Sequence, residues 1–205
     1  MSISCNICNT KKARRHCLAT NAGICPQCCG EQRENTLDCP LECPHLRDAR
    51  VREKAPELDA SQVPNMDVKI SEKFVRENEP LLFVLALALR RAMQAERAMD
   101  TDAREALEAA IQTLRTRESG LIYESRPQNP YAASIQEKLT AAAAEFEAGL
   151  AKEIGITVRD TDRLGSLVFL QRLELQHNNG RRKSRAFLDF LTHYIPEPET
   201  PPIIA

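Results

Sequence analysis

The chain contains no tryptophan, and aromatic residues make up only 4% of its 205 positions. Strands favour aromatic and β-branched residues, so this shortage argues against a sheet as the main core. Alanine, leucine, glutamate and arginine instead crowd the region after about Asn65, and all four are strong helix formers. Because 42% of the residues are hydrophobic, the chain can build a real core. The sequence therefore predicts an all-α architecture for most of its length.

An excess of charge of one sign is also missing. The chain has 28 lysines and arginines against 29 aspartates and glutamates, which leaves a formal net charge of -1. This balance excludes the chain-wide positive field that drives unspecific binding to DNA or RNA. Any affinity for nucleic acid would have to come from local basic patches.

Long hydrophobic segments are absent as well. The longest apolar run, Leu81 to Leu89, is about half as long as a membrane-spanning helix needs to be. The first residues, MSISCNICNTKK, contain no hydrophobic signal core. We therefore expect a cytoplasmic protein that does not associate with membranes.

No cysteine occurs after Cys43, but eight occur up to that position. Two pairs, Cys5 with Cys8 and Cys25 with Cys28, have the CxxC spacing, which lets two thiolates bind one tetrahedral ion from a single tight turn. The sequence predicts a zinc-binding module over residues 1–54 that holds one or two Zn²⁺ ions. Its candidate ligands are Cys5, Cys8, Cys17, Cys25, Cys28, Cys29, Cys39, Cys43 and His45, with His16 as a further candidate.

Other interpretations of these cysteines stay open. An even count is compatible with disulfide bonds, although a reducing compartment favours metal. Two tetrahedral ions need about eight ligands, so some candidates are in excess, and adjacent Cys28 and Cys29 would serve two different ions or leave one thiol unused. A catalytic zinc needs an open coordination position and a nearby base, but no HxE or HExxH arrangement occurs. Thiolate-rich coordination favours a structural ion.

The run HCLATNAGICPQCCGEQRENTLDCPLECPHL resembles the start of a family of uncharacterised bacterial proteins that carry ICPxCCGxxR followed by CPxxCxxL. The resemblance extends over most of the chain and implies a zinc-binding module followed by helices, without implying an activity. Residues from Cys5 to His45 are also similar, in order and spacing, to the two-zinc cross-braced fingers of the HIT and MYND kinds, most of which bind proteins. The chain departs from those fingers in its CysCys doublet and in lacking a final HxxxC.

A charged, proline-containing stretch at residues 55–66 is typical of a linker, and the proline-rich tail at 196–205 is expected to be disordered. Between them, residues 67–195 carry helix caps and apolar residues at helical spacing. These signals predict helices at 71–77, from 80 to about 99, 103–118, 130 to about 155, from 161 or 162 to about 178, and 184–194. The chain as a whole is expected to be a small Cys/His zinc module followed by an irregular all-α helical bundle.

Two segments of the helical region are candidate sites. The non-helical stretch SGLIYESRPQNPY concentrates five residues that could line a surface or pocket site, since loops on a rigid scaffold often carry function; they are Tyr123, Glu124, Arg126, Asn129 and Tyr131. The turn NNGRRKSR carries four cations that could bind phosphate or stay solvated near a helix C-terminus, namely Arg181, Arg182, Lys183 and Arg185.

The leading hypothesis is a zinc-binding protein with a structural metal site that acts as a protein-protein interaction or scaffold module, with an unidentified protein partner or a second copy of itself. The alternative is an RNA- or DNA-binding protein that uses basic patches at Lys11–Arg15 and Arg181–Arg185; the sequence leaves open whether the two patches adjoin in one basic face. An enzyme with its site around residues 123–131 ranks last, because no catalytic motif is present and histidine, the commonest general base, occurs after His45 only at His177 and His193.

Overall fold

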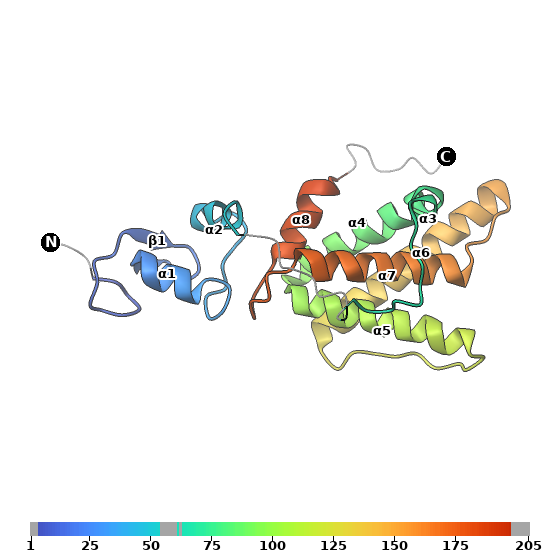
Figure 1. The fold of residues 1–205 in the computed structure, drawn as a ribbon, viewed down its shortest axis with the longest axis horizontal. Coiled ribbons are helices and arrows are strands. Elements are labelled where there is room, and N and C mark those ends of the chain that lie inside the picture. Colours follow the sequence, from blue (N-terminus) through green and yellow to red (C-terminus); the bar gives the residue numbers. More distant parts are fainter. Residues whose placement is uncertain (1–3, 54–60, 62, 198–205) are drawn as a thin grey trace.

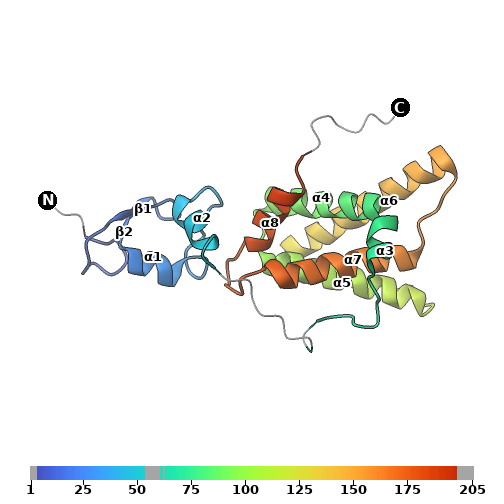
Figure 2. The ribbon, with the colours of Figure 1, turned by 45° about the horizontal axis from the view of Figure 1, so that its top comes forward.

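The computed structural model of the protein describes residues 4–53, 61 and 63–197. A small N-terminal module and a larger helical bundle lie side by side along the long axis of the molecule (Figure 1). The same separation into two parts is visible after rotation (Figure 2). Most of the predicted linker at 55–66, and the predicted tail beyond residue 197, lie outside the described residues.

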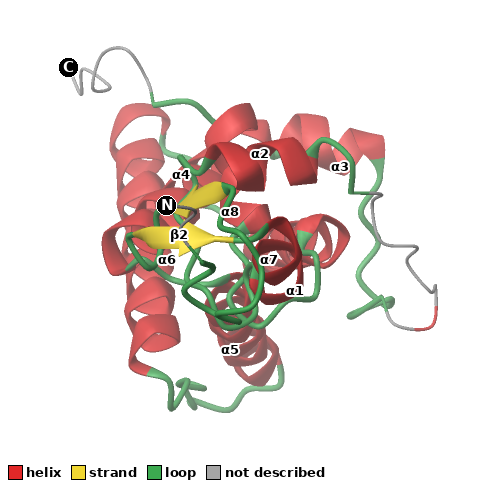
Figure 3. Cartoon of the chain, turned by 90° about the vertical axis from the view of Figure 1, so that its left-hand side faces the viewer, coloured by secondary structure: helices red, strands yellow, loops and turns green. Residues whose placement is uncertain are grey.

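The module consists of a two-stranded hairpin and two short helices (Figure 3). Strand β1, Arg15–Cys17, pairs antiparallel with β2, Ala22–Ile24, so that Cys17 lies opposite Ala22. Helix α1 spans Pro26–Gln32 and helix α2 spans Pro44–Arg50. Each of these helices starts with a proline directly after a cysteine, and proline suits the first helical position because it lacks the N–H that would be unpaired there. The prolines therefore hold Cys25 and Cys43 at helix starts.

The bundle contains six helices in the described residues, and they coincide with the predicted ones to within three residues at each end. Helix α4 packs against α6, α5 packs against α6 and α7, and α8 lies across α4 and α7. The fold is thus mostly helical, as predicted, while the small hairpin of the module was not predicted. The helices are α3 Glu72–Glu77, α4 Glu79–Glu96, α5 Asp100–Glu118, α6 Pro130–Ile154, α7 Asp160–His177 and α8 Ala186–Tyr194.

The start of α5 differs from the prediction for a physical reason. The sequence suggests that Asp102 caps a helix beginning at residue 103, but the helix begins at Asp100. The Asp102 carboxylate instead accepts a hydrogen bond from the backbone N–H of Met99 at 2.7 Å. Asp102 is therefore the acidic residue inside the first turn and not the cap, because a carboxylate three positions into a helix can bond back to the capping residue.

Buried Asp100 ties the start of α5 to the start of α8. Its carboxylate accepts hydrogen bonds from the Ser184 hydroxyl at 2.6 Å and from the N–H groups of Ala186 and Phe187 at 2.8 and 3.2 Å. The first N–H groups of a helix have no partner within the helix. An acidic side chain from another helix therefore supplies the acceptors that begin α8.

The apolar run at 81–89 forms most of the inner side of α4, where Leu81, Leu85 and Leu89 are buried. The run is apolar on every side, which is typical of a fully buried helix, but Phe83 is 40% exposed. Phe83 lines a groove of about 590 Å³ together with residues of α7 and α8. Among the described residues, no helix combines the length and the hydropathy needed to cross a bilayer.

Candidate metal centre

Four cysteines of the module converge on one point. The sulfur atoms of Cys5, Cys8, Cys25 and Cys28 all lie within 4.8 Å of one another. A tetrahedral zinc ion with bonds of about 2.3 Å to four sulfurs separates them by about 3.8 Å, which fits within this limit. Three of the four thiols are buried and Cys8 is half-buried. These cysteines, here named the Cys5 cluster, are therefore arranged to hold a metal ion.

Local backbone geometry positions the cluster from two sides. Cys5 and Cys8 lie in a tight turn in which the N–H of Asn9 donates to the Cys5 carbonyl at 2.8 Å, and Asn9 adopts a left-handed φ of 56°. Cys25 caps α1, and its sulfur accepts a hydrogen bond from the N–H of Cys28 at 3.4 Å. The hairpin joins the two sides, because the N–H of Asn6 donates to the Gly23 carbonyl at 2.9 Å.

The thiols of the cluster differ in acidity. Hydrogen bonds from the hydroxyl and backbone of Thr10 lower the pKa of Cys8 to about 6. The side-chain hydrogen bond with Cys25, followed by burial, raises the pKa of Cys28 to about 12. Packed thiolates repel each other unless a cation lies between them, so a bound divalent ion is what allows all four to ionise together.

The other four cysteines surround a second point. Cys17, Cys29, Cys39 and Cys43 are all buried, and they line a cavity of about 10 Å³ together with His16 and His45. Adjacent Cys28 and Cys29 therefore face different groups: Cys28 belongs to the Cys5 cluster and Cys29 lines the second cavity. Their side chains diverge because successive side chains on a helix point about 100° apart. The structure has all eight cysteines as free thiols, with no disulfide bond.

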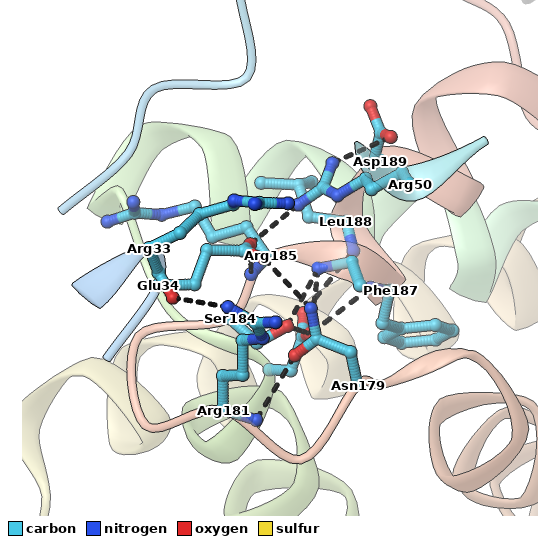
Figure 4. A network of polar contacts seen from close by, with 12 residues as sticks. Arg33, Glu34, Arg50, Asn179, Arg181, Ser184, Arg185, Phe187, Leu188 and Asp189 are labelled. Carbon is cyan, nitrogen blue, oxygen red and sulfur yellow. Dashed lines mark hydrogen bonds and ion pairs between the residues drawn. The ribbon is translucent and has the colours of Figure 1, made fainter. Parts of the chain in front are cut away.

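The module is attached to the bundle through a buried carboxylate. Glu34, directly after α1, is 0% exposed and has a left-handed φ of 53°. Its carboxylate accepts hydrogen bonds from Arg50 of α2 at 2.8 Å and from the Asn179 amide at 2.8 Å (Figure 4). Its carbonyl accepts a hydrogen bond from the N–H of Lys183 at 2.7 Å. Arg50 also pairs with Asp189 of α8 at 2.6 Å. We call the contacts around Glu34 the latch.

Three cations of the predicted phosphate-binding turn take part in this attachment. Arg181 donates to the Arg33 carbonyl at 2.8 Å, and the Lys183 ammonium donates to the Thr36 carbonyl at 2.9 Å. Arg185 is buried and pairs with Asp38. Arg182 alone of the four is exposed. The sequence suggested none of these contacts, because their acceptors are mostly backbone carbonyls of the module.

The second basic stretch, residues 11–15, lies elsewhere. Lys11, Lys12 and Arg14 are exposed, and the segment before β1 lies at the end of the module that points away from the bundle (Figures 1 and 2). The turn at 181–185 contacts the opposite end of the module. The two stretches therefore do not form the single basic face that the sequence left open.

The five residues of the predicted loop site are not brought together. Tyr123 and Glu124 line a cavity against the bundle, although Tyr123 is 66% exposed. Asn129 caps α6 by accepting a hydrogen bond from the N–H of Tyr131 at 3.0 Å. Arg126 and Tyr131 are exposed. Only the first two of these residues therefore share a cavity.

Comparison with models of protein families, with curated proteins and with solved structures finds no match to this chain. The function proposed below therefore rests on the geometry of the chain itself.

Proposed function

We propose that the protein is a zinc-binding scaffold in which a structural ion at the Cys5 cluster folds the module, and in which the module and the bundle together bind a protein partner. The observation that carries this proposal is the convergence of four sulfur atoms within 4.8 Å. Four thiolates select zinc over harder cations such as magnesium or calcium. They also fill a tetrahedral coordination sphere, which leaves no position for a substrate.

The second set of cysteines supports a second ion in the same module. Cys17, Cys29, Cys39 and Cys43 come from a strand, a helix, a loop and a helix start, and they face one small cavity. In contrast to the Cys5 cluster, their sulfurs surround the cavity without converging, so an ion there would draw them inward. The expected stoichiometry is one ion per chain for the Cys5 cluster alone and two if this set also binds.

A role in protein interaction is supported by the groove between α4, α7 and α8. It is lined by aromatic and aliphatic side chains that include Phe83, Phe169, Phe190 and Tyr194. Tyr194 is 65% exposed and Phe83 is 40% exposed. Exposed apolar surfaces of this kind on a folded chain are typical of protein-binding sites, and aromatic residues often supply most of the binding energy there.

Nucleic-acid binding has less support. Three of the four cations of the turn at 181–185 already contact groups of the module, which leaves Arg182 and the separate stretch at 11–15. A continuous basic face that tracks a phosphate backbone would need both stretches on one side.

Two measurements test the proposal. Native mass spectrometry and elemental analysis of the purified chain should find zinc, and chelation should unfold the module while the helical signal of the bundle remains.

Affinity capture from the host with the wild type and with Phe83→Glu should recover a protein that the variant loses. A metal-free module that stays folded would refute the metal site, and recovery of nucleic acid alone would favour the alternative function.

A further inference from the structure

The cavity that Tyr123 and Glu124 line lies between helices of the bundle, apart from the metal module, and is partly open to solvent. It has a volume of about 480 Å³, and side chains of α4, α5, α6 and α7 line it together with the segment 121–124. Most of the lining is aliphatic, and the principal residues are Leu85, Leu114, Leu121, Leu139, Ala143 and Leu167.

The volume of this cavity is larger than that of the gaps that ordinary side-chain packing leaves. Protein interiors are close-packed and leave few voids larger than a water molecule. Sites for small molecules have volumes of about 300–1,000 Å³ and combine apolar walls with a few polar groups. The cavity between the helices has both properties.

The outer wall of the cavity, residues 121–125, is held in place by hydrogen bonds to the bundle. Residues 121–125 have no regular secondary structure, but three side chains of the bundle hold their backbone. Thr116 donates to the Tyr123 carbonyl at 3.0 Å, and the N–H of Ser125 donates to the Thr113 hydroxyl at 3.0 Å. Gln136 donates to the Ser125 carbonyl at 2.7 Å. The wall therefore keeps its place although Leu121 is 62% exposed.

Two arginines, Arg117 and Arg163, place positive charge in the lining of the cavity. The Arg163 side chain is 17% exposed and pairs with Glu147 and, at 3.6 Å, with Asp160. The Arg117 guanidinium has no ion pair within the described part of the chain. Burial, and then the positive charge of Arg117, lower the pKa of Arg163. The lining carries one carboxylate, the exposed Glu124, against these two cations.

We propose that this cavity binds a small molecule with an aliphatic body and one carboxylate, the chemistry of a medium-chain fatty acid. The aliphatic chain lies among the leucines of the four helices, where it is removed from water. The carboxylate lies beside the Arg117 guanidinium, accepts hydrogen bonds from it, and offsets the repulsion between the Arg117 and Arg163 cations. This inference is independent of the proposed zinc site.

Titration of the full, zinc-loaded chain with decanoate tests the proposal, with decanol as the neutral probe of the same length. Binding is followed by calorimetry and by chemical-shift changes of residues that line the cavity. Decanoate should bind about tenfold or more tightly than decanol, because a hydrogen bond to a charged group contributes at least that factor. Arg117→Gln should remove most of this difference, whereas Lys152→Gln, which removes an exposed cation of α6 outside the cavity, should leave it unchanged.

Ala143→Phe provides a second test, because the larger side chain fills the cavity without removing a charge. It should abolish binding of both probes while circular dichroism and zinc content stay as in the wild type. Equal affinities for decanoate and decanol would overturn the assignment of an acidic ligand. If neither probe bound, or if Ala143→Phe left binding intact, the site would be overturned. None of these outcomes alters the zinc content on which the proposed function depends.

Discussion

The Asn179 side-chain amide donates a hydrogen bond of 2.8 Å to the buried carboxylate of Glu34, which lies 145 positions away in the sequence. The two residues belong to different parts of the molecule, the turn after α7 and the end of the module's α1. Because Glu34 is 0% exposed, its carboxylate depends on protein partners: Arg50 comes from its own module, and docking adds Asn179. The module and the bundle therefore depend on each other at this point.

Glu34→Ala should destabilise the protein strongly. The change leaves the Arg50 guanidinium, which is 12% exposed, without one of its two carboxylate partners, and it also removes the acceptor of Asn179. Loss of one partner from a buried ion pair costs about 3 kcal/mol or more. Urea unfolding of the zinc-saturated protein measures this cost. Glu31→Ala, which removes an exposed carboxylate of α1 three positions before Glu34, is the matched control and should change the free energy of unfolding by less than about 0.5 kcal/mol. Equal effects of the two substitutions would show that the latch is not stabilising.

Cys25→Ser should remove one zinc ion per chain. The serine hydroxyl is a poor zinc ligand compared with a thiolate, and Cys25 also caps α1 through its sulfur, so the module should lose its fold with its metal. Elemental analysis and native mass spectrometry measure the loss. His16→Ala replaces an exposed residue outside the Cys5 cluster and should keep that ion. If Cys25→Ser retained the wild-type zinc content, the assignment of the Cys5 cluster would be wrong.

Gly165→Ala should destabilise the bundle although alanine favours helix. A Cβ at position 165 of α7 would lie 2.4 Å from the tip of the Phe74 ring, which packs on it from α3. Such overpacking costs about 1–3 kcal/mol, more than the gain of about 1 kcal/mol from replacing a helical glycine. Gly149→Ala in α6 meets no atom within 4 Å and should raise the free energy of unfolding. Thermal and urea unfolding of both variants compare the two effects, and stabilisation by Gly165→Ala would contradict the packing of Phe74.

His177 should make stability fall as the pH is lowered from 8 toward 5.5. Burial lowers its pKa below the ordinary value of 6.5, and its ring stacks on Phe190 with centroids 3.6 Å apart. The unfolded chain therefore takes up a proton near pH 6.5 that the folded chain still excludes. The free energy of unfolding decreases from that pH down to the folded pKa and changes no further through this group.

His177→Phe keeps an aromatic ring at this position and removes the titration. The variant should have a flatter pH dependence than the wild type when both are unfolded in urea with saturating zinc. Zinc release affects both proteins equally. The difference between their slopes of unfolding free energy against pH therefore gives the contribution of His177. Parallel slopes would show that the imidazole does not titrate differently on folding.

Much of the bundle could be predicted because its helix ends depend on local chemistry. Asn129 with Pro130 begins α6 as expected, and Gly120 and Gly155 follow α5 and α6 with left-handed φ values of 81° and 66°. A cap or a left-handed glycine requires only residues within one turn, so the sequence contains the necessary information. The Cys5 cluster is similar, because CxxC spacing mounts two thiolates on one turn.

The latch could not be predicted because it depends on contacts between distant segments. Glu34 is one of many glutamates in the sequence, and a charged residue is rarely fully buried without a partner. The partners of its carboxylate are the side chains of Arg50 and Asn179 and the backbone N–H of Arg185, and none of these follows a pattern that points to residue 34. The same reason explains why Arg181 and Lys183 suggested a phosphate site, since a basic turn does not indicate which acceptors it meets. A non-glycine residue with positive φ, such as Glu34, likewise becomes visible only in the folded chain.

The long separation between Glu34 and Asn179 also orders events during synthesis. At about 5–20 residues per second, the ribosome needs roughly 7–30 s to add the 145 residues between them. Once Cys43 is made, early in that interval, all eight cysteines are present, while the surface that receives the module does not yet exist. The four cysteines of the Cys5 cluster are therefore complete long before the bundle, so metal capture by the cluster does not have to wait for the latch.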